Sequence, residues 1–148
     1  MTITSTELEG ARKAASAQTM EFVRLGYAGA SLDFRTQVMD AGTFRECMAV
    51  IGGYNKFSGA DTADAIGRIF GELMSVDVGR ESSVVLYLYV PFTKQQRIGT
   101  HEGSEPIPDG EREAFAGDIC RIGRELHADE IDIKEHDGRP YCVRLWWD

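Results

Sequence analysis

The sequence predicts an α+β fold in which an antiparallel or mixed sheet of about four to five strands carries its helices mainly on one face. Three observations support this prediction. Residues 83–92 are apolar on both sides of an extended chain, as in a covered central strand. Residues 130–147 alternate as in a terminal hairpin, and segments with helical apolar spacing precede them. The length of 148 residues fits one domain, 1–148.

The N-terminal segment predicts a helix from Thr6 to Leu25. Thr6 and Glu9 have the spacing of a capping box, in which the two residues satisfy each other's unpaired backbone donors. Gly26 is expected to end the helix in a left-handed conformation. Because the first turns carry only weakly apolar residues, we expect this helix to be partly exposed or to pack on a partner.

The middle of the chain predicts further strands and helices. Residues 31–38 alternate as in a half-buried strand. A short helix over 43–51, opened by Thr43, and another over 61–73 follow. The strand at 83–92 gives the strongest signal in the chain, and an edge strand over 96–100 comes next.

The C-terminal part predicts a helix over 109–126, capped by Asp109, and then a hairpin. The hairpin strands, 130–135 and 141–147, flank Asp137-Gly138, a typical type I′ turn. Trp146 and Trp147 fall on opposite faces of the last strand. One belongs to the core, and the other is either covered by the N-terminal helix, which we favour, or exposed as an anchor for a partner.

The net charge of −8 comes from 24 acidic and 16 basic residues. The imbalance is concentrated between residues 102 and 137, which hold twelve acidic and four basic residues. Such a chain lacks the basic face that a nucleic-acid backbone requires, so we expect no direct binding to nucleic acid. A partner with a basic surface fits this charge better.

Composition also bears on location. Three cysteines, Cys47, Cys120 and Cys142, are far apart and odd in number, so we expect buried free thiols in a reducing compartment. No apolar run reaches the roughly 20 residues of a membrane span. The first 15 residues lack the pattern of a signal peptide. These observations predict a cytoplasmic protein that does not enter a membrane.

No catalytic or metal-binding motif is present in the sequence. It contains neither a Gly-x-Ser-x-Gly motif nor a phosphate-binding Gly-x-x-x-x-Gly-Lys loop. Its histidines (His101, His127 and His136) do not have the spacing of a zinc site. We therefore assign no catalytic residue, metal or cofactor, and favour a protein that is not an enzyme.

The segment 86–100 resembles the strand and acetyl-CoA loop of the acetyltransferase superfamily, which carry the pattern Gln/Arg-x-x-Gly-x-Gly/Ala. Gln96 and Gly99 match this pattern, but His101 occupies its last position. The prolines that follow prevent a helix from starting there to hold a pyrophosphate. We therefore do not assign the chain to that family.

The helix over 109–126 suggests a surface for a protein partner. Its core stripe is formed by Phe115, Ile119, Ile122 and Leu126. Beside that stripe, Glu111, Asp118 and Glu125 form an acidic one. Together with Arg144 and Trp146, these acids predict a small binding protein that occupies a basic surface of its partner. Bacterial or phage inhibitors, immunity proteins and anti-defence proteins have this profile, and a homo-oligomer is a further prediction.

A small-ligand protein is the alternative. The loops 53–59 and 93–103 concentrate basic and aromatic side chains that would hold a phosphorylated ligand or nucleotide, for sequestration or for an uncommon hydrolysis. The residues proposed for this pocket are Tyr54, Lys56, Lys94, Arg97 and His101. This alternative requires the two loops to converge in the fold.

Overall fold

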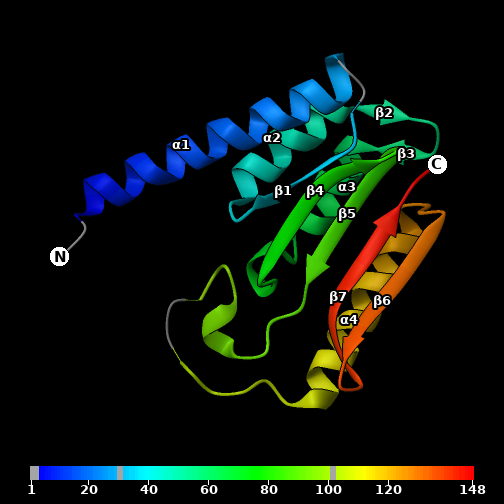
Figure 1. Ribbon diagram of the computed structural model, residues 1–148. Coiled ribbons are helices and arrows are strands. Elements are labelled where there is room, and N and C mark those ends of the chain that lie inside the picture. The colour runs from blue at the N-terminus through cyan, green and yellow to red at the C-terminus, as the bar shows by residue number, and fades with distance from the viewer. Residues whose placement is uncertain (1–3, 30–31, 101–102) are drawn as a thin grey trace.

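The computed structural model describes residues 4–29, 32–100 and 103–148. Within them, five strands form one antiparallel sheet in the order β1-β4-β5-β7-β6 (Figure 1). The strands are β1 (Phe34–Val38), β4 (Ser75–Glu81), β5 (Ser83–Tyr89), β6 (Glu130–His136) and β7 (Arg139–Trp146). The predicted α+β class with a sheet of this size is therefore confirmed.

Four α-helices accompany the sheet in the described part of the chain: α1 (Ser5–Arg24), α2 (Ala41–Ile51), α3 (Gly59–Gly67) and α4 (Asp109–Glu125). A small hairpin of β2 (Gly53–Tyr54) and β3 (Phe57–Ser58) joins α2 to α3. Short turns of other helix types complete the fold: η1 (Leu25–Gly29, π-helical), and η2 (Phe70–Glu72) and η3 (Lys94–Gln96), both 3₁₀. None of these helices combines the length and apolarity that a bilayer crossing demands.

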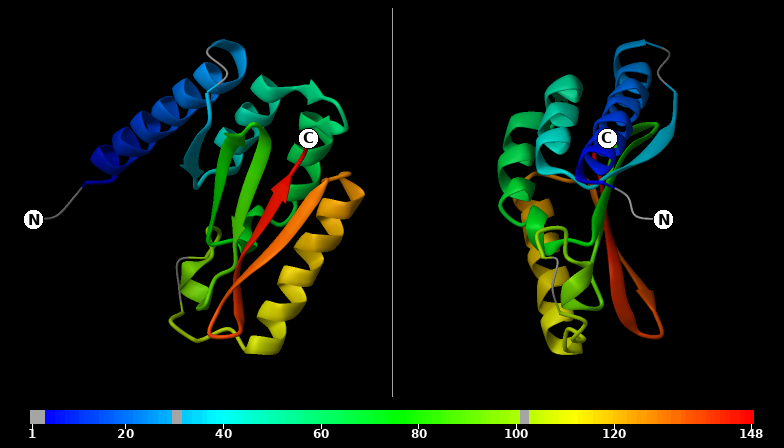
Figure 2. Two further views of the ribbon diagram at one scale, coloured as in Figure 1. Left: turned by 45° about the vertical axis from the view of Figure 1, so that its right-hand side comes forward. Right: turned by 90° about the vertical axis from the view of Figure 1, so that its left-hand side faces the viewer.

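The helices α2, α3 and α4 cover one face of the sheet, and α1 lies along its β1 edge and extends away from the body (Figure 2). The main core forms between the sheet and the three covering helices. Fully buried side chains from every layer meet there, such as Phe44, Ile66, Leu86 and Ile119. The opposite sheet face has its own small buried cluster, and no helix of the described residues lies over it.

Helix starts differ from the prediction by a few residues. The capping box of α1 joins Thr4 to Glu7, whose backbone N–H donates to Thr4 Oγ1 at 3.1 Å, and not Thr6 to Glu9. Similarly, the Asp40 carboxylate accepts the Thr43 N–H at 2.9 Å and caps α2. In both helices the N-cap is a residue that precedes the predicted one in the chain. Its side chain accepts a hydrogen bond from the unpaired backbone N–H three residues later.

Two other helix-end predictions are wrong. Asp109 is the first residue of α4 and Pro108 occupies the cap position, without a side-chain hydrogen bond. Gly26 does not take a left-handed conformation but lies in η1. A Cβ atom there would lie 2.1 Å from the Phe34 ring, so the glycine is needed for close packing against that side chain.

Strand β4 was not predicted, and it lies between β1 and β5. A single residue, Ser82, with a φ of 63°, links β4 to β5. The edge strand expected over 96–100 is not formed. The backbone N–H groups of Ile98 and Gly99 instead donate to the carbonyls of Leu73 and Gly71, at 2.8 and 3.0 Å, so this segment pairs with the region of η2.

The C-terminal hairpin is confirmed. Asp137 and Gly138 have φ values of 52° and 72°, as a type I′ turn requires. Trp147 is the buried tryptophan, and its Nε1 donates to the Leu126 carbonyl at 2.9 Å. Trp146 is only partly buried and is not covered by α1, because β4 and β5 lie between β7 and the β1 edge where α1 packs.

Candidate functional site

The sheet face opposite the helices, called here the open face, is the first candidate site. Strand register aligns Asp77, Tyr87, Arg144 and Asp132 in one row across β4, β5, β7 and β6. Because side chains alternate along a strand, neighbouring rows of this face carry residues two positions away. The side chains of those rows include Tyr89, Glu130, Cys142 and Trp146, and Glu81 lies one row further along β4.

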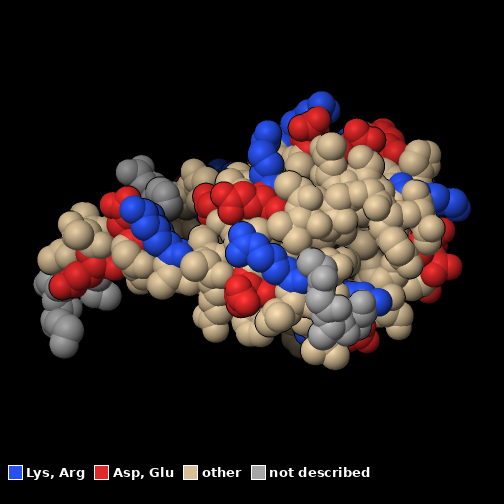
Figure 3. All heavy atoms as spheres, turned by 90° about the horizontal axis from the view of Figure 1, so that it is seen from above, with Lys and Arg blue, Asp and Glu red and all other residues tan. Residues whose placement is uncertain are grey.

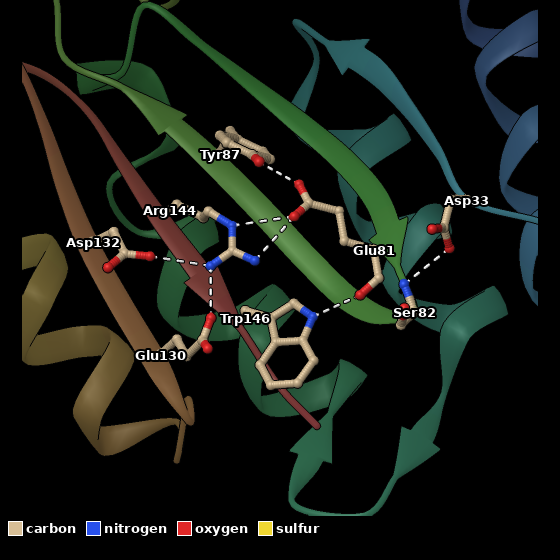
Figure 4. Close-up of polar contacts among 8 residues, drawn as sticks. All are labelled: Asp33, Glu81, Ser82, Tyr87, Glu130, Asp132, Arg144 and Trp146. Atoms are coloured by element: carbon tan, nitrogen blue, oxygen red, sulfur yellow. Dashed lines mark hydrogen bonds and ion pairs between the residues drawn. The ribbon is translucent and has the colours of Figure 1, made fainter.

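Arg144 lies at the centre of the open face and binds three carboxylates (Figure 4). Its Nη2 lies 2.9 Å from Glu81 Oε2, and its Nη1 lies 3.0 Å from Glu130 Oε2 and 3.1 Å from Asp132 Oδ2. The Arg144 side chain is only 14% exposed, whereas the three acidic side chains are 39%, 55% and 56% exposed. In this cluster the carboxylates are therefore more exposed than the guanidinium that they share.

Glu81 is held by two aromatic residues as well. The Tyr87 hydroxyl donates to its carboxylate, and Trp146 Nε1 donates to its backbone carbonyl at 2.8 Å. Partial burial acts to raise the pKa of Glu81, but hydrogen bonds from Tyr87 and Arg144 outweigh it and hold the pKa below its usual value. Glu81 therefore remains a carboxylate at neutral pH.

A second group of contacts continues the open face toward β1. The guanidinium of Arg35 lies over the Tyr87 ring at 4.5 Å, and its Nε is 3.7 Å from Asp77 Oδ2. The Tyr89 hydroxyl donates to the same Asp77 oxygen at 2.8 Å. These contacts fix the tyrosine rings in place without a covering helix.

A buried cysteine lies beneath these rings. Cys142 is fully buried, and burial raises its pKa to about 12. The thiol therefore stays protonated at neutral pH. Cys47 and Cys120 are also buried and free, which confirms the prediction for all three cysteines.

The arrangement on the open face suits non-covalent recognition. Its polar side chains are held in mutual hydrogen bonds and ion pairs, and it combines Trp, Tyr and Arg, the residue types that dominate binding energy at interfaces. Among residues 4–29, 32–100 and 103–148, no group of three or more His, Cys, Asp or Glu side chains is placed to hold a metal ion.

The residues predicted for partner binding lie on two sides of the molecule. Arg144 and Trp146 belong to the open face, whereas Glu111, Asp118 and Glu125 project from α4 in the helical layer. All three α4 acids are exposed, as expected. Arg121 Nη2 lies 3.9 Å from Asp118 and its Nη1 lies 3.2 Å from Glu125, so part of this stripe is neutralised locally.

The residues proposed for a phosphorylated ligand do not converge. Tyr54 and Lys56 lie in the small hairpin beside the start of β5, where Asn55 donates to the carbonyl of Asp148 at 2.8 Å. Lys94 and Arg97 follow the opposite end of β5, a distance of about 20 Å for a strand of this length. His101 lies outside the described residues. The common pocket that the alternative function requires is therefore not formed by the described residues.

The two loops instead line separate cavities. Tyr54 borders a cavity of about 170 Å³ near Tyr27 and Arg80. Arg97 borders another, of about 240 Å³, between α4, η2 and the segment after β5. This second cavity, called here the α4 cavity, also receives Glu111 and Asp118, so it unites residues that the sequence suggested for two different functions.

Sequence reasoning missed Glu81, Tyr87, Glu130 and Asp132 as parts of a site. Glu81 lies in the unpredicted strand β4, and it is 63 residues from Arg144 in the chain. The alternation of residues 130–135 does place Glu130 and Asp132 on one side of a strand. That alternation puts the two acids on the same strand face, but it does not identify Arg144 as their partner.

Comparisons of the chain with protein-family models, with curated proteins and with solved structures found no match.

Proposed function

We propose that this chain is a non-enzymatic binding protein whose open face docks on a basic surface of a partner protein. One observation carries the proposal: Arg144, 14% exposed, holds three more exposed carboxylates on a sheet face that none of the described helices covers. Within this cluster one cation is shared by three anions, which leaves two negative charges in surplus there. An inhibitor, an immunity protein or an anti-defence protein acts by this kind of occupation.

The physical chemistry of the open face supports binding in two ways. Carboxylates already fixed by hydrogen bonds lose little conformational freedom when a partner arrives, so less of the interaction energy is spent on ordering them. Negative charge at the surface speeds the encounter with a basic partner and selects against acidic ones. Trp146, partly buried beside Glu130, supplies apolar contact area next to the charged centre.

The proposal can be tested with the partner captured by the tagged full-length protein from lysate of the organism that encodes it. The dissociation constant of the purified pair is then measured for wild type and for a Glu130→Gln/Asp132→Asn variant. We expect the double variant to bind at least about tenfold more weakly, and wild-type binding to weaken as salt rises from about 0.05 M to about 0.5 M.

The matched control is a Glu46→Gln/Asp64→Asn variant, which removes the same charge from exposed positions on α2 and α3. Its affinity should stay within about twofold of wild type. Wild-type affinity in the Glu130→Gln/Asp132→Asn variant, or binding that salt does not alter, would overturn the proposal.

A further inference from the structure

We propose that the outer edge of β6 pairs with β6 of a second copy of this chain, so that two sheets join into one across a two-fold axis. The surface involved is an edge of the sheet and not its open face, so this inference does not rest on the proposed function. Three properties of β6 support it: the direction of its backbone groups, its unbroken course and the order of its side chains.

One side of the β6 backbone faces away from the sheet. β6 ends the strand order β1-β4-β5-β7-β6, and no strand of the described residues lies beyond it (Figure 1). The Trp147 N–H donates to the Val84 carbonyl at 3.0 Å, so every second residue of β7 directs its backbone groups to β5. Arg144 lies between those residues and directs its groups to β6 and its register partner Asp132. The backbone groups of the two residues that flank Asp132 therefore point outward, where another strand can bind them.

The course of β6 is regular over its whole length of seven residues. Lys134 lies opposite Cys142, and the residue after it lies opposite Pro140. The extra residue at this irregularity is therefore Tyr141 of β7, and not a residue of β6. Bulges and prolines in an edge strand hinder its pairing with another chain, and β6 contains neither.

The side chains of β6 are complementary to those of a second β6. When two copies pair antiparallel with Ile133 on the two-fold axis, Asp132 of each copy faces Lys134 of the other, and Glu130 faces His136. Ile133, which is 47% exposed, then packs against its own copy. Charged side chains on an edge strand usually oppose pairing, but in this order they favour one register.

Neighbouring registers are disfavoured by the same side chains. With Asp132 on the axis, its carboxylate would face the same carboxylate of the second copy, and with Lys134 on the axis two ammonium groups would meet. Lys134 makes no ion pair among the described residues, so the proposed register gives its ammonium group an acidic partner. The remaining pair, Glu135 opposite Ile131, adds no charge contact.

The geometry of this dimer has two consequences. Directly opposite residues of paired strands point to the same face, so the open faces of the two copies lie on the same side of one continuous sheet. A single pair of edge strands forms an interface at the small end of the range for specific complexes, below about 1,200 Å² in total. We therefore expect monomer and dimer to exchange as the protein concentration changes.

Sedimentation velocity of the full-length protein, without any partner, tests the association. The weight-average sedimentation coefficient should rise from the monomer value toward that of a dimer between about 5 µM and about 500 µM. Lys134→Glu should raise the dimer dissociation constant at least about tenfold, because it places a second acid opposite each Asp132. A wild-type protein that stays monomeric over this range, or equal dissociation constants of Lys134→Glu and wild type, would overturn the proposal.

The matched control for this variant is Lys13→Glu. It makes the same change of net charge at an exposed position of α1, which packs at the opposite, β1, edge of the sheet. Its dissociation constant should stay within about twofold of wild type. A loss of dimer as large as that in Lys134→Glu would show that net charge, and not the β6 edge, controls association, and would also overturn the proposal.

Cysteine substitutions test the register. Directly opposite residues in a hydrogen-bonded antiparallel pair have Cα atoms about 5.5 Å apart, which a disulfide can span. Ile133→Cys should therefore form a covalent dimer in an oxidising buffer. Glu135→Cys keeps every charged pair of the dimer but should form none, because its two copies lie farther apart than the limit of about 7 Å. Wild type controls for the three native cysteines, which are buried, and faster cross-linking of Glu135→Cys than of Ile133→Cys would contradict the register.

The two proposals of this chain fail separately. The dimer is measured in the absence of a partner, and Lys134→Glu leaves Arg144 and its three carboxylates in place. A failure to capture a basic partner therefore leaves the sedimentation result intact, and a monomeric chain can still bind a partner through its open face.

Discussion

At the scale of single residues, Arg144 determines how the open face is organised. Its guanidinium is the shared partner of three carboxylates that come from two different strands, β4 and β6. Without that cation, like charges would lie close together on the sheet, and their repulsion would act against folding. The same residue therefore has a structural role and sets the charge that a partner meets.

Replacement of Arg144 with glutamine should lower the free energy of unfolding by about 2 kcal/mol, because charge-assisted hydrogen bonds to a mostly buried group are lost. Urea unfolding followed by circular dichroism measures the change. Arg121→Gln is the control, since the Arg121 side chain is 56% exposed and binds exposed acids. It should cost less than about 1 kcal/mol, and equal losses in the two variants would contradict this account.

Glu81 should make the free energy of unfolding depend on pH in the acid range. Its pKa in the folded chain is lower than its ordinary value of 4.5, so its contribution is present above about pH 4.5 and is lost as the pH falls through the folded pKa. Unfolding free energies measured between about pH 3 and pH 6 should therefore fall less steeply for Glu81→Gln than for wild type. Asp40 and Asp129 also have lowered pKa values, so some acid dependence should remain in the variant.

At the scale of elements, α4 shows how position within one helix decides the effect of a glycine. A Cβ atom at Gly117 would meet nothing within 4 Å, whereas one at Gly123 would lie 2.6 Å from Leu145 Cδ2 of β7. Gly117 lies on the exposed side of the helix, whereas Gly123 faces β7 at a point of close approach between helix and sheet. Gly123 permits that approach, and Gly117 does not take part in it.

The same substitution at these two positions should therefore have opposite effects. Gly117→Ala should raise the free energy of unfolding by up to about 1 kcal/mol, because alanine favours an exposed helix interior. Gly123→Ala should lower it by about 1–3 kcal/mol through overpacking against β7. Thermal and urea unfolding of the two variants measure both values, and changes of the same sign would show that α4 packs differently.

Elements with a local pattern could be predicted from the sequence, and those that depend on pairing could not. The hairpin around Asp137-Gly138 has its turn and its alternation within adjacent residues. Strand β4 has a glycine, Gly79, in its interior, where a Cβ atom would lie 2.4 Å from the Phe34 carbonyl of β1. The glycine is required by the close approach of β1, and that approach exists only in the folded sheet, so the sequence of β4 does not by itself indicate a strand.

The candidate site depends on the register in which β6 pairs with β7. A two-residue turn would pair Asp132 with Val143, but the irregularity between Lys134 and Glu135 shifts the register by one residue and places Asp132 opposite Arg144. The shift brings both side chains to the open face. Residue alternation alone cannot reveal such a bulge, so the acids of β6 were predicted as a charged surface and not as partners of Arg144.

At the scale of the whole molecule, acidic side chains lie among basic ones. Acidic and basic side chains are interspersed on the face seen from above (Figure 3). Several acids of the 102–137 segment have local partners, such as Asp129 with Lys56 at 3.5 Å and Glu105 with Lys94 at 3.3 Å. In the Arg144 cluster, by contrast, three carboxylates share one cation.

The extension of α1 from the body is a second property of the whole molecule. Its first three turns are exposed, and Leu8 at 45% exposure lies on this free part. This arrangement confirms the expected partial exposure of the helix. A homo-oligomer remains a prediction of the sequence.

The two tryptophans provide the most direct test of the central claim, that the open face is the partner-binding surface. Each has one indole N–H signal in a ¹H–¹⁵N spectrum, which a Trp146→Phe variant assigns. Trp146 donates from the open face, and Trp147 donates to Leu126 within the core. On addition of the captured partner, the Trp146 signal should shift or broaden and the Trp147 signal should stay in place. An unchanged Trp146 signal in the saturated complex would contradict the account.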